Sequence, residues 1–188
     1  MTERPVLVLG ATSAIARATA CELARQGHGL FLAGRYLPEL WKIASDAHIR
    51  YGVEVNVGVF NAEDTVSHLQ FVDTVIKRTG GLGGVIYAVG DLGSQADIEK
   101  DPLLAHAIVD RNYVGAVTVL LLLANHFEEL RSGFVVGISS VAGDRGRAPA
   151  RGLLLEGRNT VEGVERGRAA GPGLAPLGPR RRRRGVHR

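Results

Sequence analysis

Short apolar runs alternate with amphipathic segments along the first 143 residues of the chain. Five runs are largely apolar, which is typical of strands that are covered on both faces of a parallel sheet. They are Val6–Leu9, Leu30–Ala33, Val53–Phe60, Val85–Val89 and Phe134–Ser139. Because such strands alternate with helical patterns, the sequence predicts an α/β fold with a doubly wound parallel sheet over residues 4–143.

The segments between these runs repeat their apolar residues with the period of a helix. The predicted helices are Ile15–Gln26, Leu37–Tyr51, Glu63–Thr79 and Pro102–Phe127. In the first three, the residues expected to face the sheet are Ile15, Ala18, Thr19 and Leu23; Leu40, Ile43, Ala44 and Ala47; and Val66, Leu69, Val72 and Ile76. Gly27 is expected to end the first helix, because glycine readily adopts the backbone conformation found beyond a helix C-terminus.

The composition changes at about Ala148. Arginine, glycine and proline make up 22 of the last 41 residues, and residues 180–184 are all arginine. Residues 1–147 carry a net charge of −3 and residues 148–188 one of +7, so the basic character of the chain lies in its tail. A segment with so little apolar surface cannot build a core. We therefore expect one folded domain over residues 1–147 and a disordered tail over residues 148–188.

The cysteine content and the apolar runs predict a cytoplasmic protein. The single Cys21 cannot form an internal disulfide, which suits a reducing compartment. The chain leads directly into a strand, so we expect no signal peptide. The longest apolar run, Val114–Ala124, is too short to span a bilayer and predicts a buried helix instead.

A small, polar turn follows the first predicted strand, and it is a candidate phosphate-binding turn. A strand, a tight turn and a helix direct backbone N–H groups and the helix N-terminus toward a bound phosphate. Gly10 permits the turn, Thr12 and Ser13 can cap the helix and donate hydroxyls, and Ala14 and Ile15 open the helix. The turn alone also fits a strand–turn–helix unit that binds nothing.

Three further motifs follow this turn in a fixed order. They are Tyr87-Ala88-Val89-Gly90, Asn112-Tyr113-Val114-Gly115 and Ser139-Ser140-Val141-Ala142-Gly143. Together with the turn, they resemble the Thr-Gly-x-x-x-Gly-Ile-Gly, Asn-Asn-Ala-Gly, Asn-x-x-Gly and Ser-Ser-x-x-Gly motifs of the short-chain dehydrogenase/reductase family. The resemblance covers Val6 to about Arg147. It implies a Rossmann-type NAD(P)-binding domain and an oxidoreductase that acts on a small carbonyl or alcohol. Within the family, the sequence resembles a bacterial subgroup that includes decaprenylphosphoryl-ketoribose reductase.

The resemblance also implies roles for individual residues. Ala88, Val89 and Gly90 would contact the cofactor. Ser140 would polarise the substrate carbonyl, and Asn112 would hold a water molecule of the proton pathway. The aspartate that binds adenine in the family corresponds to Val59 by this interpretation, which weakens the expected adenine contact.

The proton donor of the family is absent downstream of Ser140. The family uses a tyrosine four residues before a lysine, because the lysine lowers the pKa of the phenol. The last tyrosine of this chain is Tyr113 and the last lysine is Lys100. The arginines of the tail cannot replace the pair, because arginine stays charged. We therefore expect impaired activity, and we expect no metal site.

The end of the second strand favours NADP(H) over NAD(H). An acid at this place would bind the 2′-hydroxyl of the adenosine ribose and repel a 2′-phosphate. Gly34 takes the place and Arg35 follows, so a phosphate is favoured.

Three explanations of the tail remain open. In the first, the tail is the product of translation out of frame, which would remove the remaining strands and the tyrosine–lysine helix of the family. It can be a genuine basic extension whose arginine run binds nucleic acid or another polyanion. The chain can also be a non-catalytic nucleotide-binding protein. The first is favoured, because the change falls inside a family motif. A homodimer formed through the long helix is expected only for the intact family fold.

Overall fold

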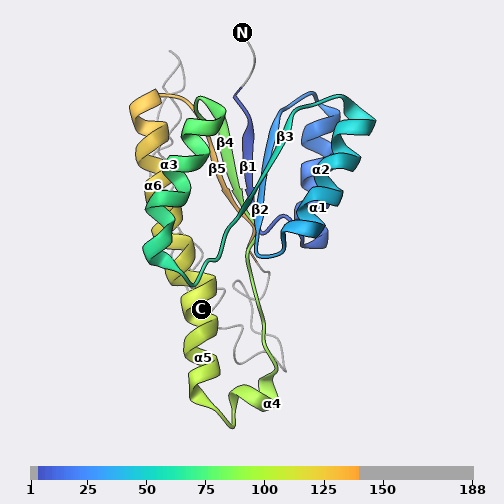
Figure 1. The fold of residues 1–188 in the computed structure, drawn as a ribbon. Coiled ribbons are helices and arrows are strands. Elements are labelled where there is room, and N and C mark those ends of the chain that lie inside the picture. The colour runs from blue at the N-terminus through green and yellow to red at the C-terminus, as the bar shows by residue number, and fades with distance from the viewer. Residues whose placement is uncertain (1–3, 140–188) are drawn as a thin grey trace, which may run out of the picture.

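The computed structural model describes residues 4–139, and five parallel strands form one sheet in this part of the chain (Figure 1). The strands are β1 (Val6–Leu9), β2 (Leu30–Gly34), β3 (Val55–Val59), β4 (Gly84–Tyr87) and β5 (Val135–Gly137). Their order in the sheet is β3-β2-β1-β4-β5, with β1 paired to β2 on one side and to β4 on the other. This arrangement confirms the doubly wound α/β fold.

Helices cover both faces of the sheet (Figure 1). The helices on one face are α1 (Ala14–Arg25) and α2 (Leu37–Tyr51), and those on the other are α3 (His68–Thr79) and α6 (Gly115–Leu130). Two short helices, α4 (Gln95–Ile98) and α5 (Pro102–Val109), lie between β4 and α6. Each face of the sheet therefore has its own apolar core, one under α1 and α2 and one under α3 and α6.

The predicted inward face is confirmed for α2 and wrong in part for α1, where Leu23 packs against the core as predicted. In α2 the buried residues are Leu40, Ile43, Ala44 and Ala47. In α1 they are Ala16, Ala20 and Ala24, whereas Ile15 is 60% exposed. Alanine side chains let the helix axis approach the sheet closely, so the contact face is defined by small residues and not by the largest apolar ones.

The predicted inward face of α3 is also wrong in part. A short 3₁₀ turn, Thr65–Ser67, precedes the helix and changes its phase. The buried residues are His68, Val72 and Val75, whereas Val66 and Leu69 are exposed. A pattern drawn through the 3₁₀ turn therefore assigns the wrong face.

The long predicted helix Pro102–Phe127 extends to Leu130 and contains a π-helical turn at Asp110–Val114. The extra residue of a π-turn rotates the helix face, and such turns often occur at functional sites. By length and mean hydropathy (1.6) the segment Pro102–Leu130 could cross a membrane. Its α6 part packs against the sheet through Val119, Leu123 and Phe127.

We expect the protein to lose stability in acid because of His126 on α6. Its ring nitrogen Nε2 accepts a hydrogen bond from the Leu82 N–H at 3.3 Å, which a doubly protonated ring cannot do. Burial lowers the pKa of His126, and nearby Arg4 lowers it further while Glu129 opposes the shift. The stabilising effect is therefore present above the unfolded-state pKa of about 6.5 and is lost as the pH falls below it.

We expect the free energy of unfolding, measured in urea from pH 8 to pH 5, to fall less steeply in H126Q than in the unaltered chain. The control is H106Q, since His106 is an exposed histidine on α5. An unchanged slope in H126Q would contradict the prediction.

Candidate cofactor-binding site

The turn after β1 is built around Gly10. Its φ angle is +77°, a conformation that favours glycine. A Cβ atom at this position would lie 2.7 Å from the carbonyl oxygen of Ala88 and 2.9 Å from the nitrogen of Val89. The turn is also tied to β2, because the N–H groups of Gly10 and Ala11 both donate to the Ala33 carbonyl at 2.9 and 3.0 Å. The turns after β1 and β4 are therefore in backbone contact.

Ser13 caps the N-terminus of α1. Its Oγ accepts a hydrogen bond from the Ala16 N–H at 3.2 Å, and its backbone is extended as expected for an N-cap. The positive end of the helix dipole and the hydroxyls of Thr12 and Ser13 therefore lie at one place, which suits an anion.

A pocket of about 300 Å³ lies at the carboxyl ends of β1, β2, β3 and β4. It is lined by Gly10, Thr12, Ser13, Gly34, Arg35, Phe60, Asn61, Ala62, Ala88, Val89, Gly90, Asp91 and Arg111. Ligands of open α/β sheets bind at the carboxyl ends of the strands, where the strand order reverses.

The pocket brings together most of the predicted cofactor residues. Gly10, Thr12, Ser13, Arg35, Ala88, Val89 and Gly90 all line it. Ala14 and Ile15 begin α1 beside the pocket but are not part of its lining. Ser140, Val141–Gly143 and the basic tail lie outside the described residues. Within residues 4–139, no group of three or more potential metal ligands occurs.

The wall formed by Phe60, Asn61 and Ala62 after β3 was not predicted from the sequence. Val59, which the resemblance placed at the adenine position, is 55% exposed and is not part of the lining. β3 ends at Val59, and the wall begins at the next residue. Asn61 is the polar residue that the structure places there.

Asn61 is held by its neighbours. Its side-chain oxygen accepts from the Glu63 N–H at 3.3 Å, and its backbone carbonyl faces Nε2 of the buried His68 at 3.1 Å. The His68 ring also stacks on Phe60, with the ring centroids 5.0 Å apart. His68 therefore holds Phe60 and Asn61 of the pocket wall in place from the core side.

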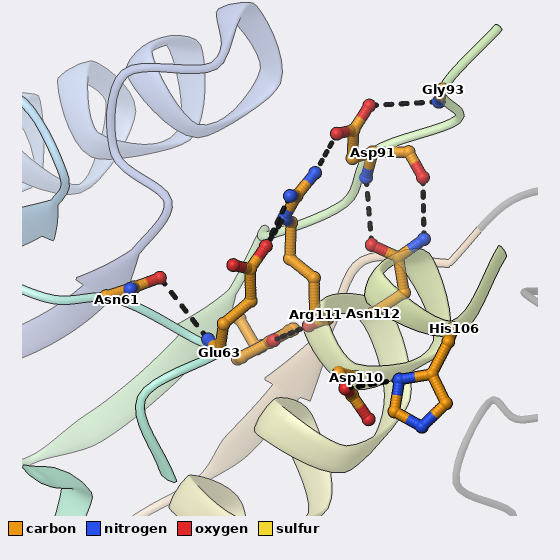
Figure 2. Close-up of polar contacts among 9 residues, drawn as sticks. Asn61, Glu63, Asp91, Gly93, His106, Asp110, Arg111 and Asn112 are labelled. Carbon is orange, nitrogen blue, oxygen red and sulfur yellow. Dashed lines mark hydrogen bonds and ion pairs between the residues drawn. The ribbon is translucent and has the colours of Figure 1, made fainter. Parts of the chain in front are cut away.

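Arg111 joins the loops after β3 and β4 (Figure 2). Its Nε and Nη2 face the carboxylate of Glu63, and its Nη1 faces the carboxylate of Asp91. Asn112 binds the backbone of Asp91 on both sides, with its Oδ1 accepting from the N–H at 2.9 Å and its Nδ2 donating to the carbonyl at 2.7 Å. The Asp91 side chain also accepts from the Gly93 N–H at 3.0 Å. Arg111 and Asn112 thus fix the β4 loop together.

Tyr87 supports this arrangement from the core. Its hydroxyl donates to the backbone carbonyl of Arg111 at 3.2 Å, inside the π-helical turn. Burial raises the pKa of Tyr87 above its usual range, so the phenol stays protonated and remains a donor. Gly115 follows the turn and contacts the backbone of Ala62 so closely that a side chain would not fit. Arg111 in the π-turn and Gly115 directly after it therefore contact the two walls of the pocket, at Asp91 and at Ala62.

A family model described as short chain dehydrogenase matches residues 4–151. The chain belongs to the short-chain dehydrogenase family. A curated relative from Streptomyces coelicolor, an uncharacterised oxidoreductase, is 39% identical over 145 residues. This match covers 77% of the chain but 57% of the relative, so this short-chain dehydrogenase sequence spans little more than half of the relative's length.

Solved short-chain dehydrogenase structures share the fold. A crystal structure of F189W actinorhodin polyketide ketoreductase with NADPH superposes with a TM-score of 0.76 at 24% identity, covering 84% of this chain and 60% of the other. NAD⁺-bound xylitol dehydrogenase gives 0.73 at 24% identity, covering 84% and 59%. At these identities the likeness establishes the fold alone.

Proposed function

We propose that the pocket binds NADP(H) and that the protein is a reductase, or the reverse dehydrogenase, of a small carbonyl or alcohol. The observation that carries the proposal is one pocket at the carboxyl ends of the strands, which is lined by the Gly10 turn, the capped N-terminus of α1 and Ala88–Gly90. In dinucleotide-binding folds the first glycine permits the tight turn after the first strand, and the helix N-terminus that follows holds the pyrophosphate.

The residues around the pocket fit a dinucleotide. The N-terminus of α1 with Thr12 and Ser13 would hold the phosphates, and Ala88–Gly90 would form the floor beside them. Phe60–Ala62 would cover the adenosine end. The cofactor supplies hydride when bound, and the chain supplies its binding and orientation.

The residues of the reaction step remain a proposal from the family resemblance. Ser140 would orient a substrate carbonyl. Asn112 is engaged with the backbone of Asp91, and this contact fixes the loop that carries Gly90. No tyrosine–lysine pair follows Ser140 in the sequence, and loss of a catalytic acid costs about 10²–10⁴-fold. We therefore propose that this chain binds the cofactor but transfers hydride slowly.

Arg35 is the residue that we expect to select NADP(H). It follows β2 and lines the pocket beside Gly34, and Asp91 is the one acidic residue of the described lining. We expect R35S to weaken NADPH binding by about tenfold to a hundredfold, since hydrogen bonds to charged groups contribute roughly 1.5–3 kcal/mol. NADH binding should change by no more than about twofold, because it has no 2′-phosphate.

The experiment is a fluorescence titration of the unaltered chain, R35S and R25S with NADPH and NADH. R25S is the control, because Arg25 is exposed at the far end of α1 and pairs with Glu22. An equal loss of both cofactors in R35S would contradict the assignment of Arg35 to the 2′-phosphate.

A further inference from the structure

Arg111 has no role in the site described so far beyond joining two loops, yet it lines the pocket. We propose that the guanidinium plane of Arg111 is the surface on which the adenine base of the cofactor stacks. The inference rests on the proposed function, since it concerns the base of the same dinucleotide.

The hydrogen-bonding edges of Arg111 are already occupied. Each of its three guanidinium nitrogens faces a carboxylate oxygen, two at Glu63 and one at Asp91 (Figure 2). The donors of a guanidinium all lie in its plane, so a group bound along these edges leaves the flat faces for other contacts. The side chain is 19% exposed and Arg111 lines the pocket, as a contact between its guanidinium face and a planar ligand requires.

The net charge of Arg111 and its two carboxylate partners disfavours a phosphate beside Arg111. Arg111 is paired with two carboxylates, so the cluster has a formal charge of −1 at neutral pH. A phosphate placed here would be repelled, whereas it would be attracted by Arg35 and the N-terminus of α1. A neutral, flat base is compatible with the cluster, because guanidinium planes stack on aromatic rings.

The position of the cluster matches that of the base. The Phe60 N–H donates to the Gly34 carbonyl at 3.0 Å, so the Phe60–Ala62 wall lies directly beside the residue that precedes Arg35. A base on the ribose held at Arg35 would enter the space between this wall and Ala88–Asp91. Arg111 lies between the same two loops, because it binds Glu63 after β3 and Asp91 after β4. Phe60, Ala62 and Val89 also line this pocket.

The test is a calorimetric titration of the unaltered chain, R111K, E63Q and R50K with NADPH, with its hypoxanthine analogue and with NMNH, which has no purine. The lysine of R111K keeps the positive charge and removes the planar guanidinium group. We expect R111K to weaken both purine cofactors by about tenfold and to leave NMNH within about twofold, since a stacked guanidinium does not read the base edge. E63Q weakens the contact along one edge of the guanidinium. We expect it to reduce the affinity for the purine cofactors less than R111K does, and again to leave NMNH binding nearly unchanged.

R50K is the matched control, because Arg50 forms an exposed ion pair with Asp46 on α2. If the affinity of R111K for the purine cofactors is within twofold of that of the unaltered chain, the inference is overturned and the proposed function is not. A proportional loss of NMNH also overturns it, because the arginine would then act only on the shape of the whole pocket. If R111K does not fold, judged by circular dichroism, E63Q replaces it in the test. A lower ratio of purine to NMNH affinity in E63Q than in the unaltered chain supports the inference, and an unchanged ratio overturns it. Absence of any binding by the unaltered chain overturns both the proposed function and the inference.

Discussion

The G10A variant is expected to lose cofactor binding by more than about a hundredfold. The added Cβ would lie 2.7 Å from the Ala88 carbonyl oxygen and 2.8 Å from its carbon, and both are backbone atoms of the opposite turn. Backbone cannot swing aside as a flexible side chain does, so the turns after β1 and β4 must separate. The positive φ of +77° adds roughly 1–2 kcal/mol of strain. The variant should therefore be less stable as well as unable to hold the pyrophosphate.

G52A separates these two effects. Gly52 ends α2 with a φ of +69°, nearly the same conformation, but an added Cβ would meet no atom of the described residues within 4 Å, so only the conformational strain remains. We expect G52A to lose some stability in a urea titration and to bind NADPH as the unaltered chain does. Equal binding by G10A and G52A would contradict the role of the Gly10 contact.

The G115A variant is expected to be destabilised by about 1–3 kcal/mol and to bind cofactor more weakly. Helix propensity alone predicts the opposite, because alanine is favoured over glycine by about 1 kcal/mol inside a helix. The packing effect is larger here. A Cβ on Gly115 would lie 2.9 Å from the carbonyl carbon of Ala62 and closer still to its oxygen. Forcing an extra methyl group into such a contact typically costs about 1–3 kcal/mol.

The displaced residue in G115A would be Ala62, which lines the pocket next to Asn61. Thermal unfolding and NADPH titration should therefore change together. The control is G29A, whose added Cβ would meet its nearest neighbours at 3.5 Å, an ordinary contact distance. A G115A variant that is more stable than the unaltered chain would show that the helix can shift without cost.

The hydrophobic pattern predicted the strands and α2 well and the faces of α1 and α3 poorly. The stripe of α2 is made of residues that differ clearly from their polar neighbours, and its four predicted inward residues are those buried in the structure. In α1 the buried stripe is alanine, whereas Ile15 is exposed and Leu23 is only partly buried. Packing against a close sheet selects for small volume there, and a hydrophobicity pattern does not register volume.

The site shows the same division between local and long-range information. The Gly10 turn is local, and its residues can be recognised from a strand, a glycine and a capped helix. The Arg111 cluster joins residues that are 48 and 20 positions apart in the chain, and no local pattern predicts such a contact. One signal was present: Arg111 is a charged residue within a largely apolar stretch, directly before Asn112. A partly buried charge needs partners, which the acids of the neighbouring loops supply.

The central claim is that the pocket at the carboxyl ends of β1, β2, β3 and β4 binds a nicotinamide dinucleotide. An isothermal calorimetric titration of the unaltered 188-residue chain with NADPH tests it most directly. We expect saturable binding of one NADPH per chain, with NADH bound at least about tenfold more weakly. No saturable heat with either cofactor up to millimolar concentration, from a chain whose circular dichroism is that of a folded α/β protein, would contradict the claim.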